Sequence, residues 1–236
     1  GRNKNALENH FDRATEVEAT LAAKGDADRL AHVQRATALA QIHYVRQGDP
    51  LGLGHAVLRA RRHVGDHAFA VLLGDDLIHE QDDLLSLMLE VHRSTEASVL
   101  ALMEVDPSQT HLYGIATVDE VSEDGVCRVT GLVEKPRAGD APSNLAVIGR
   151  YVLRPEVFDI LERTEAGVGG EIQLTDALRG LAASPETGGL VGIVFRGRRF
   201  DTGDRLSYIK ATIELALERE DLGPDLRSWL TALIAR

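Results

Sequence analysis

The chain has 236 residues, 44% of them hydrophobic, which is enough for one large domain or two small ones. Its formal net charge of −11 argues against a general nucleic-acid binder, because a phosphate backbone is met by basic patches. The single cysteine, Cys127, excludes an internal disulfide framework, and no apolar run approaches the length that spans a membrane. With no signal peptide either, these features predict a cytoplasmic protein without a membrane partner.

Helices are expected at the N-terminal end of the chain. Apolar residues recur at spacings of three and four over residues 1–24, which predicts a helix with a core-facing stripe, and Gly25 would end it. A shorter, alanine-rich helix is expected over residues 27–39, and residues 42–45 predict a short strand.

A glycine-rich loop over residues 46–55 follows that strand and leads into a helix expected at residues 56–62. Glycine has no Cβ, so such a loop allows backbone to approach a ligand closely. The loop lacks the lysine of a P-loop and the spacing of a Rossmann fingerprint, however. Taken alone, it is more typical of a plain turn between a strand and a helix.

The stretch from Phe69 to Leu73 has five consecutive apolar residues, the pattern of a strand buried on both faces of a parallel sheet. Gly74, Asp75 and Asp76 follow directly. Ligands of open α/β sheets bind beyond the carboxyl ends of the strands, and paired carboxylates there suit Mg²⁺ that also carries a substrate phosphate. The alternative for this pair, a helix N-cap beside a solvated neighbour, stays open at this point.

The middle of the chain changes from alternating helices and strands to strands alone. A helix over residues 83–93 and a strand over residues 97–105 continue the alternation, which predicts a parallel sheet with helices on its faces. β-rich runs follow at residues 115–121 and 126–133, joined by an Asp-Gly turn, and at residues 146–153.

The C-terminal part is predicted to be mainly helical. Helices are expected over residues 171–183, 206–220 and 225–235, and a strand over residues 190–195. In the last helix, Trp229 is expected to pack inward at an element or subunit contact.

Polar motifs end the expected strands or open the loops, where binding residues concentrate. In chain order they are Arg46-Gln47-Gly48, Gly52-Leu53-Gly54-His55-Ala56, Leu72-Leu73-Gly74-Asp75, Tyr113-Gly114, Val133-Glu134-Lys135-Pro136, Ser143-Asn144-Leu145-Ala146, Gly149-Arg150-Tyr151, Gly170-Glu171-Ile172-Gln173-Leu174-Thr175-Asp176 and Asp201-Thr202-Gly203. In this order and spacing they resemble the bacterial UTP–glucose-1-phosphate uridylyltransferases, a family of sugar nucleotidyltransferases. The resemblance runs from Gly1 almost to the C-terminus.

The resemblance implies an α/β, Rossmann-like fold: a mixed, mostly parallel sheet with helices on both faces and a β-rich sugar-binding insertion at residues 106–153. We expect one nucleotidyltransferase domain over residues 1–236, with C-terminal helices at residues 206–236. The implied reaction is Mg²⁺-dependent uridylyl transfer from UTP to glucose 1-phosphate, giving UDP-glucose and pyrophosphate, in a homo-oligomer (dimer or tetramer). A thymidylyl- or cytidylyltransferase acting on the same sugar phosphate and a non-catalytic sugar-nucleotide-binding paralogue stay open as alternatives.

The resemblance also implies roles for individual residues. Gln47 and the backbone at Gly52 match the groups that read the uracil edge. Asp75 and Asp201 match the two aspartates that hold Mg²⁺, and Lys135 matches the lysine that meets the phosphate of glucose 1-phosphate. Asp75, Lys135 and Asp201 are therefore the expected catalytic residues.

Four further matches concern the sugar. Glu134 matches the acid that bonds glucose hydroxyls, Gly114 and Val147 match backbone contacts to the sugar, and Glu171 is expected to support the same side. Single residues also have plain structural alternatives. Glu134 and its neighbour Lys135 could form an exposed ion pair of little energetic value. In the same way, Asp201 could cap a helix and Gln47 could cap a turn.

The chain departs from the family at its start. Family members begin with a strand and a glycine-rich loop of the pattern Gly-x-Gly-Thr-Arg, which contacts the nucleotide phosphates, and nothing in this sequence resembles it. Gly1 matches the point just after that portion. We therefore expect the protein to be longer than this sequence, and a true fragment to have lost catalysis.

Overall fold

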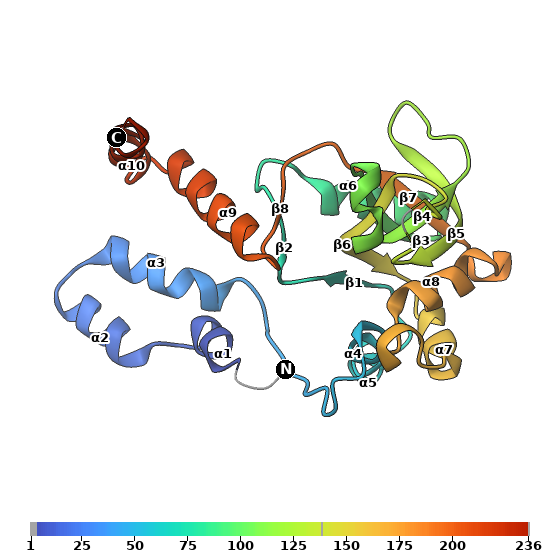
Figure 1. The fold of residues 1–236 in the computed structure, drawn as a ribbon. Coiled ribbons are helices and arrows are strands. Elements are labelled where there is room, and N and C mark those ends of the chain that lie inside the picture. The colour runs from blue at the N-terminus through green and yellow to red at the C-terminus, as the bar shows by residue number, and fades with distance from the viewer. Residues whose placement is uncertain (1–3, 138, 236) are drawn as a thin grey trace.

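The computed structural model describes residues 4–137 and 139–235 and has a six-stranded sheet, a two-stranded sheet beside it and surrounding helices (Figure 1). Its α-helices are α1 (Asn5–Phe11), α2 (Thr15–Ala23), α3 (Ala27–Ala38), α4 (Leu53–Leu58), α5 (Arg61–Val64), α6 (Leu84–Thr95), α7 (Glu156–Arg163), α8 (Leu174–Ala182), α9 (Arg205–Glu218) and α10 (Gly223–Ile234). Its strands are β1 (Phe69–Leu72), β2 (Asp76–Ile78), β3 (Ser98–Glu104), β4 (Gly114–Val118), β5 (Val126–Glu134), β6 (Leu145–Leu153), β7 (Leu190–Val194) and β8 (Arg199–Asp201).

The six-stranded sheet is mixed, with the order β1–β6–β3–β7–β5–β4. Within the described part of the chain, β3 pairs with β7 in parallel, whereas the other strand pairings are antiparallel. The prediction of a mostly parallel sheet is therefore wrong. The reason is β6, which lies between β1 and β3 and runs antiparallel to both, so these two strands point the same way without pairing.

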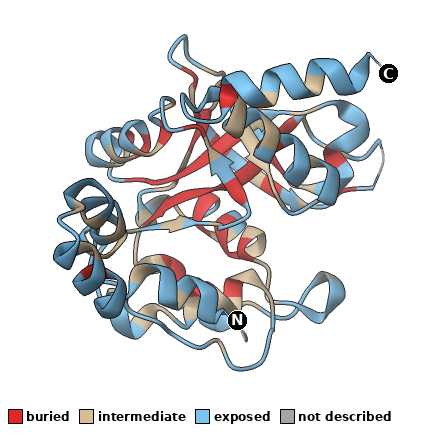
Figure 2. Cartoon of the chain, turned by 90° about the vertical axis from the view of Figure 1, so that its left-hand side faces the viewer, coloured by how far each residue is buried: buried red, intermediate tan, exposed pale blue. Residues whose placement is uncertain are grey.

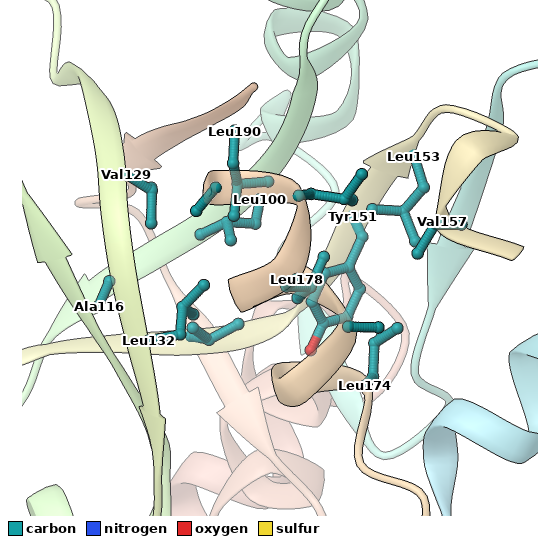
Figure 3. Close-up of a cluster of buried hydrophobic side chains, with 14 of the residues drawn as sticks. Leu100, Ala116, Val129, Leu132, Tyr151, Leu153, Val157, Leu174, Leu178 and Leu190 are labelled. Carbon is teal, nitrogen blue, oxygen red and sulfur yellow. The ribbon is translucent and has the colours of Figure 1, made fainter. Parts of the chain in front are cut away.

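Helices cover both faces of this sheet, as predicted. On one face, α7 and α8 pack with α4 against the strands, and Figure 3 shows Leu174 and Leu178 of α8 in one cluster with Leu100, Leu132 and Tyr151. On the other face, α6 contributes a smaller cluster of buried residues, Leu84, Met88 and Val91. Because side chains alternate along a strand, β3 supplies apolar residues to both clusters.

The run Phe69–Leu73 forms the edge strand β1 and is not buried on both faces, contrary to prediction. Leu72 is half-exposed, and the strand has β6 as its one described partner. Phe69 faces inward and stacks on Phe158 of α7, with 4.9 Å between the ring centroids. A continuous apolar run indicates a strand, but it does not decide whether the strand is central or at an edge.

The N-terminal helices lie apart from the large sheet (Figure 1). The single helix predicted over residues 1–24 is two helices, α1 and α2, separated at residues 12–14, and Gly1 to Asn3 lie outside the described residues. Its expected core-facing stripe is wrong, because Leu7 and Val17 are about half-exposed. The strand expected at residues 42–45 is also absent from the described structure, where these residues form neither helix nor strand.

Helices α9 and α10 project away from the sheet at the other end of the chain, and Figure 2 shows that most of their surface is exposed. Trp229 of α10 is 58% exposed, so it does not pack inward within this chain. None of the described helices combines the length and the apolar composition that crossing a membrane requires.

Candidate active site

The two aspartates predicted to hold a metal lie together at a short two-stranded ribbon. Strands β2 and β8 pair antiparallel, with Asp76 opposite Asp201. The backbone N–H and the hydroxyl of Thr202 both donate to the carbonyl oxygen of Asp75, at 2.7 and 2.8 Å. This ribbon therefore joins two motifs from distant parts of the sequence.

The carboxylates of Asp75 and Asp201 face one small space. A Cβ placed on Gly203 would lie 3.2 Å from Asp201 Oδ1 and 3.5 Å from Asp75 Oδ2, so glycine keeps that space open. The described residues contain no group of three or more acidic, histidine or cysteine side chains that could hold a metal. Two carboxylates nevertheless suit Mg²⁺, which keeps several waters and takes oxygens from substrate phosphates.

Neither the Asp75–Asp76 pair nor Asp201 caps a helix, so the structure excludes the helix-cap alternative for both motifs. Asp76 begins strand β2, and the next helix, α6, is capped by Asp83. After β8 it is Asp204 whose carboxylate accepts from the backbone N–H groups of Leu206 and Ser207 and so caps α9.

Asp76 differs from Asp75 in being buried and fully paired. Its carboxylate accepts from the N–H of Gly149 at 2.9 Å and from Nε and Nη2 of Arg199 at 2.9 and 2.8 Å. Burial disfavours the charged guanidinium, but the hydrogen bonds and charge of Asp76 outweigh it and raise the pKa of Arg199 above its ordinary value. Asp76 is thus a partner of Arg199, whose role sequence reasoning missed.

A second buried arginine fixes the turn before this ribbon. The guanidinium of Arg150 on β6 donates to the backbone carbonyls of Leu73, Gly149 and Asp76. Burial lowers the pKa of Arg150, and the negative charge of Asp76 partly offsets this. The turn that presents Asp75 is therefore held by charge-assisted hydrogen bonds.

The residues expected to meet the sugar phosphate gather on β4 and β5, where Gly114 lies opposite Glu134. The hydroxyl of Thr175 donates to Glu134 Oε2 at 2.7 Å. A Cβ on Gly114 would lie 3.1 Å from that hydroxyl and 3.2 Å from the same carboxylate oxygen, so glycine leaves room for this pair. Thr175 lies in a motif recognised from the sequence, but its contact with Glu134 could be found only from the structure.

Lys135 follows β5 in the left-handed region, with φ +43°. Its N–H donates to the carbonyl of Tyr113 at 3.0 Å, which fixes the unusual backbone. Its ammonium is 3.8 Å from Glu134 Oε1 and more than half of the side chain is exposed. This contact is a weak ion pair, so the ammonium is free to turn toward an anion.

The loop expected to read the base packs on the start of the α8 segment. The N–H of Ile172 donates to the carbonyl of Leu51, and the N–H of Gly54 donates to that of Ile172, each at 2.8 Å. Gly52 has φ +99°, and a Cβ there would lie 2.8 Å from Cβ of Glu171. The conformation and the close approach both require glycine at this position.

Gln47 lies over this loop, with its amide Nε2 3.0 Å from the carbonyl of Gly52 and 3.3 Å from Nδ1 of His55. The side chain of Gln47 therefore braces the loop, which is the structural role considered above for this residue. Val147 lies in β6 opposite Leu102 and is buried, so the backbone is what it can offer to a ligand.

The fold is that of a nucleotidyl transferase. Residues 3–218 match the family model described as nucleotidyl transferase.

The chain is similar to named relatives over nearly its whole length. It is 43% identical to a UTP–glucose-1-phosphate uridylyltransferase of Staphylococcus epidermidis and 42% identical to one of Bacillus subtilis, covering 99% of this chain and 80% and 79% of theirs. A UTP-bound UGPase of Acinetobacter baumannii has a TM-score of 0.86 at 38% identity, covering 98% of this chain and 79% of that one. A UDP-glucose pyrophosphorylase complexed with UDP-glucose has a TM-score of 0.78 at 36% identity, covering 93% and 79%. The chain therefore belongs to the UTP–glucose-1-phosphate uridylyltransferase family.

Proposed function

We propose that this protein transfers a uridylyl group from UTP to glucose 1-phosphate, giving UDP-glucose and pyrophosphate. The observation that carries the proposal is the 43% identity to a UTP–glucose-1-phosphate uridylyltransferase across 99% of this chain. The convergence of Asp75 and Asp201 on the space beside Gly203 supports a nucleotidyl-transfer site within it.

An oxygen of the sugar phosphate would attack the α-phosphorus of UTP in line, and pyrophosphate would leave. That phosphate is already ionised near neutral pH, so the reaction needs neither a strong general base nor a covalent intermediate. It needs alignment and charge neutralisation, because two anions must meet. Mg²⁺ bound by Asp75 and Asp201 would supply neutralising charge at the phosphates.

The side chains of this protein would do the aligning. We assign the phosphate of glucose 1-phosphate to the exposed ammonium of Lys135, and the glucose hydroxyls to the carboxylate of Glu134, which Thr175 holds in one orientation. The backbones at Gly114 and Val147 would complete the sugar contacts.

The uracil would be read by the amide of Gln47 and the backbone at Gly52, because an amide offers both a donor and an acceptor. Glu171, whose Cβ lies close against the backbone of Gly52, would support the neighbouring sugar side. Loss of the Gln47 amide would therefore relax base choice before it affected chemistry.

The direct test measures pyrophosphate release from UTP and glucose 1-phosphate with Mg²⁺, using TTP, CTP and metal-free reactions as controls. We expect release with UTP that is lost without metal. Release with TTP or CTP in preference to UTP would instead support a thymidylyl- or cytidylyltransferase. Saturable UDP-glucose binding without release would support a non-catalytic paralogue.

We also propose a cytoplasmic homo-oligomer, a dimer or a tetramer. The assembly is supported by exposed apolar side chains on α9 and α10, among them Tyr208, Ile209 and Trp229. The compartment is supported by the free thiol of Cys127, because a reducing compartment keeps thiols unpaired. Sedimentation of the protein at several concentrations would test the assembly, and a monomer throughout would refute it.

A further inference from the structure

Arg199 is a buried cation that faces both aspartate motifs. Only 11% of its side chain is exposed, and it lies on β8 two residues before Asp201. Its Nε and Nη2 donate to both carboxylate oxygens of Asp76 on the opposite strand, and its Nη2 also donates to Asp201 Oδ2 at 3.3 Å. Residues two apart on a strand share a face, so this second contact follows from the strand geometry.

The same guanidinium also reaches the sugar-phosphate side. It lies over the ring of Tyr113, 5.6 Å from the ring centroid. The carbonyl of Tyr113 accepts from the N–H of Lys135, and Tyr113 directly precedes Gly114. One side chain therefore contacts both the segment that carries Asp201 and the segment that fixes the backbone of Lys135.

The ribbon that carries Asp201 is short and lies outside the six-stranded sheet. Strands β2 and β8 have three residues each, and a two-stranded ribbon of this size has marginal stability in isolation. Asp201 itself is more than a third exposed, and its other oxygen, Oδ1, accepts from the N–H of Gly203 at 3.0 Å. The Arg199 contact thus fixes the second carboxylate oxygen.

We propose that Arg199 is a positioning residue. Its guanidinium holds the carboxylate of Asp201 at a fixed spacing from the hydrogen-bonded backbones of Tyr113 and Lys135. The inference rests on the proposed function, in which Asp201 serves the nucleotide and Lys135 the sugar phosphate. Arg199 itself contacts neither substrate in this assignment. A planar guanidinium is suited to the task, because it presents several donors in a fixed geometry and stacks on an aromatic ring, whereas a lysine is a point charge.

A charge-balanced double variant, Asp76→Asn with Arg199→Met, separates positioning from simple stabilisation. Arg199→Met alone leaves Asp76 as a buried, unpaired carboxylate and should destabilise the fold. The double variant removes both charges, so we expect its melting temperature to rise above that of Arg199→Met. Its net charge equals that of the wild type, so a change in metal affinity reports geometry.

Two measurements test the positioning role of Arg199. The first is Mn²⁺ affinity in the presence of UTP, measured by electron paramagnetic resonance, and the second is kcat for pyrophosphate release. We expect the double variant to bind Mn²⁺ at least tenfold more weakly and to turn over at least tenfold more slowly than the wild type. Arg198→Met is the matched control, because Arg198 is the adjacent residue but pairs with Asp82 and Glu218, and it should keep both values.

A double variant with wild-type Mn²⁺ affinity and kcat would overturn the proposal. If that variant does not fold, Arg199→Lys takes its place, since it keeps the charge and loses the bridging geometry. Unchanged Mn²⁺ affinity and kcat would then overturn the proposal, whereas tenfold losses in both would support it. A wild-type protein that releases no pyrophosphate defeats the proposed function, whereas the Mn²⁺ comparison still tests Arg199. A wild type that binds no Mn²⁺ with UTP overturns the positioning role as well.

Discussion

The two sides of the candidate site are held in different ways. Gly114 and Glu134 belong to β4 and β5, strands of the six-stranded sheet whose inner face is buried under α8. Asp201 belongs to a three-residue strand outside that sheet. Hydrophobic burial anchors the first side, whereas hydrogen bonds and ion pairs of Arg150 and Arg199 anchor the second.

This difference has a consequence for function. Burial of apolar area is non-directional, so it fixes a strand but leaves single side chains some freedom. Charge-assisted hydrogen bonds are directional, and they suit a carboxylate whose oxygens must point at one small space. We therefore expect substitutions on the aspartate side to affect turnover more than stability, and substitutions in the core to do the reverse.

The largest effect on turnover is expected from Asp201→Asn. Loss of one preorganised electrostatic group costs on the order of 10²–10³-fold in kcat, and Asn retains an oxygen that can accept from the N–H of Gly203. We expect that loss together with a weaker Mg²⁺ dependence and an unchanged circular dichroism spectrum. Asp204→Asn, which caps α9 three residues later, should keep both fold and turnover. Normal turnover of Asp201→Asn would exclude Asp201 as a metal ligand.

The opposite pattern is expected from Leu100→Ala on the central strand β3. Leu100 is fully buried in the cluster beneath α8, and a Leu→Ala change in a core costs about 2–5 kcal/mol of unfolding free energy. Urea titration should show that loss, while pyrophosphate release per folded molecule changes little. The exposed Leu7→Ala provides the control for stability. A Leu100→Ala protein of normal stability but low turnover would contradict the division between the two sides.

The sequence predicted most elements but not how the strands pair. The runs at residues 97–105 and 146–153 correctly indicated the strands β3 and β6, and both are interior strands of the sheet. The equally apolar β1 lies at the edge, because position in a sheet is set by contacts distant in the sequence. The predicted parallel sheet failed for the same reason: alternation of helices and strands does not reveal that β6 inserts between β1 and β3.

The site was predicted to the extent that its residues lie in recognisable motifs. Asp75 and Asp201 were expected to act together, and β2 and β8 place them side by side. The support of the site was not predictable, because Arg199 bonds Asp76 and Thr175 bonds Glu134, and both partners are far away in the sequence. Asp76 illustrates the limit: the family match assigned the metal to Asp75 and left Asp76 as a neighbour, but nothing in the sequence indicated that its carboxylate is occupied by Arg199 and the N–H of Gly149.

A smaller effect, confined to the sugar side, is expected from Thr175→Val. The change keeps the shape of the side chain and removes the hydroxyl that donates to Glu134. A hydrogen bond to a charged group contributes about 1.5–3 kcal/mol, so the KM for glucose 1-phosphate should rise roughly tenfold or more. The KM for UTP should stay the same. Thr130→Val is the matched control, because Thr130 lies on the same strand as Glu134 but bonds the backbone of Thr117. Equal changes in both KM values would mean that Thr175 does not act through the sugar side.

The smallest effect is expected at the base, from Gln47→Ala. The amide of Gln47 braces Gly52 in this structure, so its loss removes both a base contact and a support of the loop. One neutral hydrogen bond contributes about 1 kcal/mol, which corresponds to a roughly fivefold fall in the ratio of kcat/KM for UTP to that for TTP. Gln34→Ala, whose amide bonds Glu18 among the N-terminal helices, should leave the ratio unchanged. If Gln47→Ala lowers kcat/KM for both nucleotides equally, Gln47 supports the loop without reading the base, and base choice must then come from the backbone around Gly52.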